Sequence, residues 1–252
     1  MSIMEYVKLG KGPKAFVLIS GIGMNSVLSS AEAVGSMYAR FLKDYTLYLF
    51  DRSMEIPDDV TISDFASDTV LCLRNDNVDS AIFVGMSQGG MIAQQIALDY
   101  PSMVTKLVVC SSSSGPNAIS NTVLTYWCAL AEKCDVKALN NSLVDLIYSE
   151  VTKTQFGEYF KAHENDGTPE QCKRFVALLN SSNEFDCRER LKEIKCPVLV
   201  LGSMQDKVLG AEGSLKTAEI LGCSVYMYEG YGHAVYDEAK DFLDKIEEFL
   251  LQ

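Results

Sequence analysis

The sequence predicts a doubly wound α/β fold in which a mostly parallel sheet carries a helical insertion. Short apolar runs alternate with helical patterns along most of the chain, and most of these runs are apolar on both faces. Such runs are typical of parallel strands that helices cover on both sides. One long stretch lacks any strand pattern. At 252 residues the chain can bury a large core, and no linker marks off an independent domain.

Six apolar runs are predicted as strands of the parallel sheet. They are Ala15–Ser20, Thr46–Phe50, Ala81–Val84, Leu107–Cys110, Pro197–Leu201 and Val225–Tyr228. A hairpin formed by Glu5–Leu9 and Lys14–Ile19, with its turn at residues 10–13, is expected to add an antiparallel edge.

The segments between these strands show helical periodicity. The predicted core helices are Ser26–Leu42, Ile62–Asn75, Gly90–Asp99, Ala211–Leu221 and Tyr236–Leu251. In the last of them Phe242, Ile246 and Phe249 share one stripe, which is the pattern of a surface helix packed on a sheet. Repetition of strand, helix and strand indicates the doubly wound arrangement.

Residues 116–186 contain helical patterns only. These are centred on Asn121–Lys133, Lys137–Val151, Gln155–His163 and Pro169–Asn180. We expect them to form a cap over the carboxyl edge of the sheet, where open α/β sheets bind their ligands. The predicted division is a core of residues 1–115 and 187–252 and a cap of residues 116–186.

Charge and composition exclude several classes of function. The formal net charge is −12 and the basic residues are scattered, which disfavours nucleic acid and anionic membrane surfaces as partners. No apolar run is long enough to span a membrane, and the N-terminus does not resemble a secretory signal, so a cytoplasmic protein is expected. The eight cysteines show no metal-binding spacing, and we expect free buried thiols and no metal site.

The segment Gly85–Gly89 reads G-x-S-x-G and lies between a predicted strand and a predicted helix. A serine in this context occupies a strained turn that exposes its hydroxyl, which makes Ser87 the candidate nucleophile. Such a serine needs a base. Of the two histidines, His233 follows the last predicted strand and is the candidate base, whereas His163 is expected at the solvated end of a cap helix.

Asp206 is the candidate carboxylate that orients the base. It directly follows the predicted strand Pro197–Leu201, at the sheet edge that also carries the serine and histidine. The order Ser87, Asp206, His233 is the order that this type of elbow predicts. Asp186 and Asp237 are competing carboxylates, but Asp186 is expected to end the cap and Asp237 to lie in the first turn of the last helix.

Acyl transfer also requires N–H donors for the oxyanion. The backbone N–H of Gln88 is one candidate. The other comes from the loop after the first parallel strand, where Ile22 is the first choice and Met24 the second. A phosphate-binding loop is the competing interpretation, but Ser26 replaces the third glycine of that motif and no P-loop lysine follows.

Together these features resemble the α/β-hydrolase superfamily over most of the chain. The matching segments, in family order, are Ser20–Met24, Asp51-Arg52, Ser87–Gly90, Gly202–Asp206 and Gly232-His233. The chain departs from the family at Ser20, where a histidine is usual, and at Met86, where a histidine often precedes the nucleophile. The resemblance implies a Ser-His-Asp hydrolase that needs no cofactor.

Large apolar side chains are frequent in the predicted cap, and some are expected to contact a small-molecule substrate. The candidates are Tyr126, Trp127 and Phe160, together with Met86 beside the nucleophile. They favour a small or medium apolar carboxylic ester. A lactone, a carbon–carbon bond cleaved by the same triad, or a non-catalytic receptor of the same fold are the alternatives, and a homodimer is left open.

Overall fold

The computed structural model describes residues 2–252 and contains a seven-stranded sheet in the order β1-β3-β2-β4-β5-β6-β7. The strands are β1 (Met4–Leu9), β2 (Lys14–Ile19), β3 (Tyr45–Arg52), β4 (Ala81–Met86), β5 (Val104–Cys110), β6 (Val198–Ser203) and β7 (Ser224–Tyr228). Neighbouring strands are parallel except for β1 and β3. The predicted doubly wound, mostly parallel sheet is confirmed.

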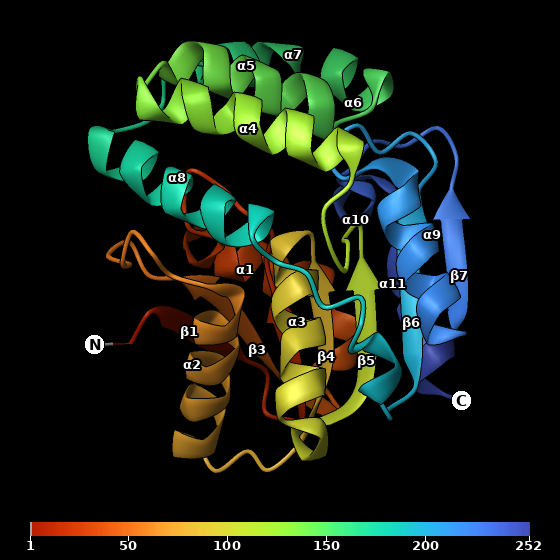
Figure 1. The fold of residues 1–252 in the computed structure, drawn as a ribbon. Helices are drawn as coiled ribbons and strands as arrows, with labels where there is room; N and C mark the ends of the chain where they lie inside the picture. The colour runs from red at the N-terminus through yellow and green to blue at the C-terminus, as the bar shows by residue number, and fades with distance from the viewer. Residues whose placement is uncertain (1) are drawn as a thin grey trace.

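Helices cover both faces of this sheet (Figure 1). The core helices are α1 (Ala31–Met37), α2 (Ile62–Asn75), α3 (Gln88–Asp99), α9 (Gly210–Leu221), α10 (Val235–Glu238) and α11 (Phe242–Leu250). Alternate residues of β2 face opposite layers: Val17 and Ile19 pack toward α2 and α3, while Phe16 and Leu18 pack toward α1 and α11. All four side chains are buried, which explains why the strand is apolar at every position.

The predicted opening hairpin does not form. Strand β1 pairs antiparallel with β3, with Met4 opposite Arg52 and Leu9 opposite Leu47, so only the antiparallel edge itself was predicted correctly. Strand β2 has no free edge, because β3 and β4 flank it. The segment of residues 10–13 instead crosses the start of β3, where a Cβ on Gly12 would lie 2.1 Å from the nitrogen of Tyr45.

Two predicted core helices are interrupted. Residues 26–42 form α1 with a short 3₁₀ turn on either side. The second turn begins where Tyr38 leaves the helical path and packs with Phe41 against Phe16. The predicted helix Tyr236–Leu251 is divided into α10 and α11 by Ala239, whose backbone is extended. Helix α2 has the predicted bounds and begins at a capping box formed by Thr61 and Asp64.

Five helices between β5 and β6, here named the cap helices, lie over the carboxyl end of the sheet (Figure 1). They are α4 (Ala118–Glu132), α5 (Val136–Ile147), α6 (Glu150–Gln155), α7 (Gly157–Ala162) and α8 (Pro169–Asn183). The predicted helix Lys137–Val151 ends at Ile147, because Tyr148 is extended and Ser149 caps α6. Helix α8 lies between the other cap helices and the sheet (Figure 1).

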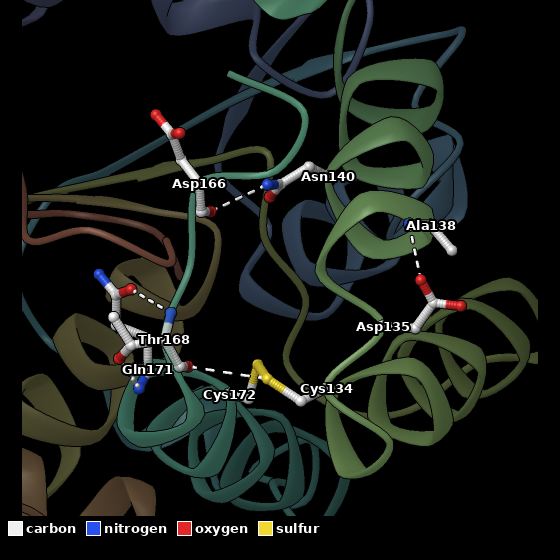
Figure 2. The surroundings of a disulfide bond; sticks show 8 residues. All are labelled: Cys134, Asp135, Ala138, Asn140, Asp166, Thr168, Gln171 and Cys172. Atoms are coloured by element: carbon white, nitrogen blue, oxygen red, sulfur yellow. Dashed lines mark hydrogen bonds between the residues drawn. A yellow bond between two sulfur atoms is a disulfide. The ribbon is translucent and has the colours of Figure 1, made fainter. Parts of the chain in front are cut away.

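A disulfide joins Cys134, in the turn after α4, to Cys172, in the first turn of α8 (Figure 2). The prediction of free thiols is therefore wrong for these two residues, whereas the other six cysteines are free in the described chain. The two Cα atoms lie 5.6 Å apart although 38 positions separate them in the sequence. Only the packing of the cap helices brings them together, so their spacing gives no signal.

Within residues 2–252, no helix combines the length and the apolar character needed to cross a lipid bilayer.

Replacing Cys134 and Cys172 together by alanine should lower the free energy of unfolding by about 2–4 kcal/mol, because the crosslink restricts the unfolded chain. Urea unfolding with and without reductant measures this difference, and Cys128→Ala, at a free cysteine of α4, is the control. Alkylation of the wild type in urea without reductant should modify six thiols. Modification of eight would contradict the disulfide.

Candidate active site

Ser87 occupies a sharp turn between β4 and α3. Its backbone has φ 52° and ψ −121°, a region that non-glycine residues rarely adopt and that costs about 1–3 kcal/mol. The turn is possible because its flanking glycines make close contacts: a Cβ on Gly85 would lie 2.3 Å from the oxygen of Gly89, and one on Gly89 would lie 2.1 Å from the oxygen of Ile19. The elbow is thus pressed against the end of β2.

His233 and Asp206 form a buried pair at the same edge of the sheet. His233 precedes α10, and its Nδ1 lies 2.8 Å from Oδ2 of Asp206, which follows β6. The N–H groups of Val208 and Leu209 donate to the other carboxylate oxygen at 2.8 and 3.0 Å. Burial raises the pKa of Asp206, but the adjacent imidazole and the hydrogen bonds outweigh it, so the pKa lies below its ordinary value.

The competing residues do not bind His233. Asp186 is exposed and pairs with Arg188 at the end of the cap helices, and Asp237 lies on α10, where it lines an open groove. His163 lies at the exposed end of α7, where its Nδ1 is 2.7 Å from the carbonyl oxygen of Tyr159. Of the candidate carboxylates, the structure brings only Asp206 into hydrogen-bonding contact with His233.

Ser87 and His233 line one narrow cavity beneath the cap helices, with a volume of about 30 Å³. Its other walls are mostly apolar. They include Ile22, Leu124, Trp127, Leu143, Ile147 and Phe175. An open groove of about 620 Å³ lies next to this cavity and runs past α1, the end of α5 and Tyr159 of α7. The residues that line both spaces are Gly21, Ile22, Ile147 and Tyr236.

Both candidate oxyanion donors lie at this cavity. The carbonyl oxygen of Ser87 accepts the hydroxyl of Ser112 at 2.7 Å, and in a trans peptide the following N–H, that of Gln88, points the opposite way. Gly21 packs against Ser87, since a Cβ on Gly21 would lie 3.1 Å from Cβ of Ser87. Ile22 lines the cavity, whereas Met24 is buried against Gly167 under the cap helices.

The structure places the four candidate substrate contacts in different surroundings. Trp127 lines the cavity, and its Nε1 donates to the hydroxyl of Ser142 at 2.9 Å. Tyr126 is 51% exposed, because its position on α4 is rotated away from the stripe that faces the core. Phe160 stacks on Tyr148 at 5.2 Å, outside the cavity, and Met86 lines the neighbouring groove.

A family model described as the alpha/beta hydrolase fold matches residues 14–240. The chain belongs to the α/β-hydrolase fold family. It is 26% identical to the protein named carbamate hydrolase RutD from Rhizobium rhizogenes, over 94% of this chain and 92% of the relative.

Solved structures of α/β hydrolases show the same fold. The enzyme MGS-M2 from a Medee basin deep-sea metagenome library superposes with a TM-score of 0.88 and 22% identity, over 99% of this chain and 94% of that one. The enol-lactonase of Burkholderia xenovorans superposes with a TM-score of 0.84 and 16% identity, over 99% and 96%.

Two features of this α/β hydrolase were not found from sequence. The Gln88 side chain is buried, and its Nε2 donates to the carbonyl oxygen of Leu178 at 2.7 Å and to the hydroxyl of Ser182 at 2.8 Å, both on α8. Arg52 and Arg174 are also buried, behind the loop after β2. The one available signal for Arg174 was a charged residue one turn before the apolar Ala177 and Leu178.

Gly89→Ala should lower the free energy of unfolding by about 2–4 kcal/mol, because the added methyl group would overlap the backbone of β2. Gly157→Ala is the control, since a Cβ there meets nothing within 4 Å, and it should change stability by less than about 1 kcal/mol. Urea unfolding measures both, and equal stability of the two variants would contradict the proposed crowding at the elbow.

Proposed function

We propose that this α/β hydrolase is a serine hydrolase that cleaves carboxylic esters with small apolar acyl groups. The observation that carries the proposal is the arrangement of Ser87 and His233 on one cavity, with Asp206 hydrogen-bonded to the imidazole nitrogen on the other side. This is the set of groups that nucleophilic acyl transfer requires.

In the first half of the reaction, the Ser87 hydroxyl attacks the ester carbonyl while His233 takes its proton through Nε2. Asp206 holds Nδ1 and stabilises the imidazolium that forms, and its lowered pKa keeps it ionised near neutral pH. The proton then passes to the leaving alcohol, and an acyl-enzyme remains.

In the second half, water attacks the acyl-enzyme, with His233 again acting as base, and the acid product leaves. The negative oxygen of each tetrahedral intermediate would accept the N–H groups of Gln88 and Ile22. Each donor would contribute about 3 kcal/mol to transition-state stabilisation. Residues of this chain suffice for every step, so the proposal includes no cofactor.

The dimensions of the site support a short acyl group. The cavity at Ser87 has a volume of only about 30 Å³ and apolar walls, whereas the adjacent groove has about 620 Å³. We therefore place the acyl chain in the cavity and the leaving alcohol in the groove. The two spaces meet at Gly21, Ile22, Ile147 and Tyr236, beside the nucleophile.

A second substrate class follows from the relatives. One of them is named a carbamate hydrolase and shares 26% identity across almost the whole chain. Carbamates and esters both present a carbonyl carbon to the nucleophile, so the same residues would serve either. A lactone and a substrate with a hydrolysable carbon–carbon bond would also test the triad. A wild-type protein that hydrolyses none of these substrates would instead be a non-catalytic receptor.

Ser87→Ala should abolish labelling by a fluorophosphonate probe and the hydrolysis of p-nitrophenyl acetate. Asp206→Asn should keep the fold but lower kcat by about 10³ or more, because the imidazole would lose its orienting charge. Asp186→Asn, at an exposed carboxylate paired with Arg188, is the matched control and should retain wild-type kcat. Hydrolysis of the ester by Ser87→Ala at the wild-type rate would refute the proposal.

Trp127→Phe should raise kcat/KM for p-nitrophenyl hexanoate relative to the acetate by several-fold to about tenfold, because the smaller ring leaves room for further methylene groups. Tyr126→Phe is the control, since this neighbouring side chain is 51% exposed and outside the cavity. A panel of acyl lengths that also includes a carbamate and a lactone measures the preference. An identical chain-length profile for both variants would place the acyl chain elsewhere.

A further inference from the structure

Two buried arginines hold the loop that follows β2. Arg52, the last residue of β3, donates through Nη1 to the carbonyl oxygen of Ser20 and through Nη2 to that of Gly21, both at 2.6 Å. Its side chain is 0% exposed, and its Nε lies 3.5 Å from Oδ1 of Asp51.

Arg174 reaches the same loop from the cap helices. It lies in the first half of α8, and its Nη1 donates to the carbonyl oxygen of Gly23 at 3.1 Å. Its Nε and Nη2 donate to the carbonyl oxygens of Ser53 and Arg52 at 2.9 and 2.8 Å. A helix of the cap and the end of β3 therefore bind the loop from the same side.

These contacts fix the direction of the amides as well as the carbonyls. In a trans peptide the carbonyl of one residue and the N–H of the next point in opposite directions, and no cis peptide occurs in the described chain. Because the carbonyl of Gly21 points to Arg52, the N–H of Ile22 points to the other side of the loop. Gly21 itself packs against Ser87, since a Cβ there would lie 3.1 Å from Cβ of Ser87.

We propose that Arg52 and Arg174 are positioning residues that hold the loop of residues 20–23 so that the N–H of Ile22 faces the oxyanion. This inference rests on the proposed function of Ser87. Arg52 fixes the peptide that carries the donor, and Arg174 makes the same loop depend on the placement of α8. Neither guanidinium touches the substrate.

The charges of this cluster support the same role. Its buried side chains are two guanidinium groups and one carboxylate, that of Asp51, whose Oδ2 accepts the N–H of Val27 at 2.8 Å. The excess positive charge lies behind the loop and favours negative charge in front of it. Burial lowers the pKa of Arg52 to about 10, so its charge persists at neutral pH.

Binding of a ketone that forms a tetrahedral adduct distinguishes this positioning role from a purely structural one. Trifluoromethyl ethyl ketone should form a hemiketal when the Ser87 oxygen bonds to its carbonyl carbon, the carbonyl double bond opens to an oxyanion, and the hydroxyl proton moves to His233. The inhibition constant of this ketone reports on oxyanion binding, and KM for p-nitrophenyl acetate reports on the ground state.

Arg52→Met and Arg174→Met should raise the inhibition constant and lower kcat/KM by similar factors. For Arg52→Met we expect both quantities to change by about a hundredfold, which approaches the effect of removing an oxyanion donor. For Arg174→Met we expect a change of about tenfold. The loss should appear in kcat more than in KM. Arg52→Lys and Arg174→Lys keep the charge and should recover part of the loss, and they serve if a methionine variant does not fold.

Gln171→Met is the matched control. Gln171 lies one turn before Arg174 on α8, and its Nε2 donates to Oδ1 of Asn25, beyond the loop carbonyls, at 2.7 Å. It also completes the capping box with Thr168, so its replacement should lower stability without changing kcat or the inhibition constant.

Four outcomes are distinguishable. Parallel losses in kcat/KM and ketone binding, absent from Gln171→Met, support the positioning role. Arginine variants that unfold at a lower urea concentration but keep the wild-type kcat and ketone binding would overturn the positioning role. So would a loss confined to KM. A wild-type protein that neither binds the ketone nor hydrolyses the ester would overturn the proposed function, and the positioning role with it.

Discussion

The contact between the elbow and β2 is the constraint on which the rest of the site depends. Gly89 lies so close to Ile19 that a single methyl group would overlap its carbonyl oxygen, and Ser87 is held at a positive φ above this contact. The strain is offset by the burial of the flanking strand and helix. Because β2 and β4 are neighbours, the loop after β2 passes directly beside Ser87. One backbone crossing therefore places both Ser87 and the loop that contains Ile22.

Stability alone does not explain the buried arginines behind that loop. Moving charged groups out of water is costly, and replacing buried ion pairs by apolar side chains is often neutral or stabilising. Here the guanidinium groups of Arg52 and Arg174 are used mainly on backbone carbonyls, and their one carboxylate partner, Asp51, also binds the N–H of Val27. Directional bonds to carbonyls determine where the opposite amide points, which an apolar replacement could not do. The cluster thus fixes the direction of the loop's amides, although burying the two guanidinium groups costs desolvation energy.

Local sequence patterns predicted the sheet and the placement of Ser87, Asp206 and His233 at one of its edges. Parallel strands are apolar at every position, and a G-x-S-x-G turn needs glycines in fixed places. Contacts between segments that are distant in the sequence could not be predicted. The pairing of β1 with β3 depends on the path of residues 10–13. The Cys134–Cys172 disulfide and the contacts of Arg174 depend on how the cap helices pack. Helical periodicity located the cap helices, but their rotation, which turns Trp127 inward and Tyr126 outward, requires knowledge of which stripe meets the core.

The cap helices are bound to the core at several points, and two of these points lie beside Ser87 and His233. Helix α8 is held by the buried side chains of Gln88 and Arg174. The junction of α5 and α6 is held by the carbonyl of Ile147, which accepts the N–H of Ala234 at 3.0 Å, next to His233. Lifting either segment would leave buried polar groups unpaired, at about 1–3 kcal/mol for each. The groove shares the wall residue Tyr236 with the cavity, and Gln88, Arg174 and Ala234 do not line the groove. In the reaction proposed for Ser87, a leaving alcohol in this groove would face solvent, and water could replace it while the cap helices stay in place.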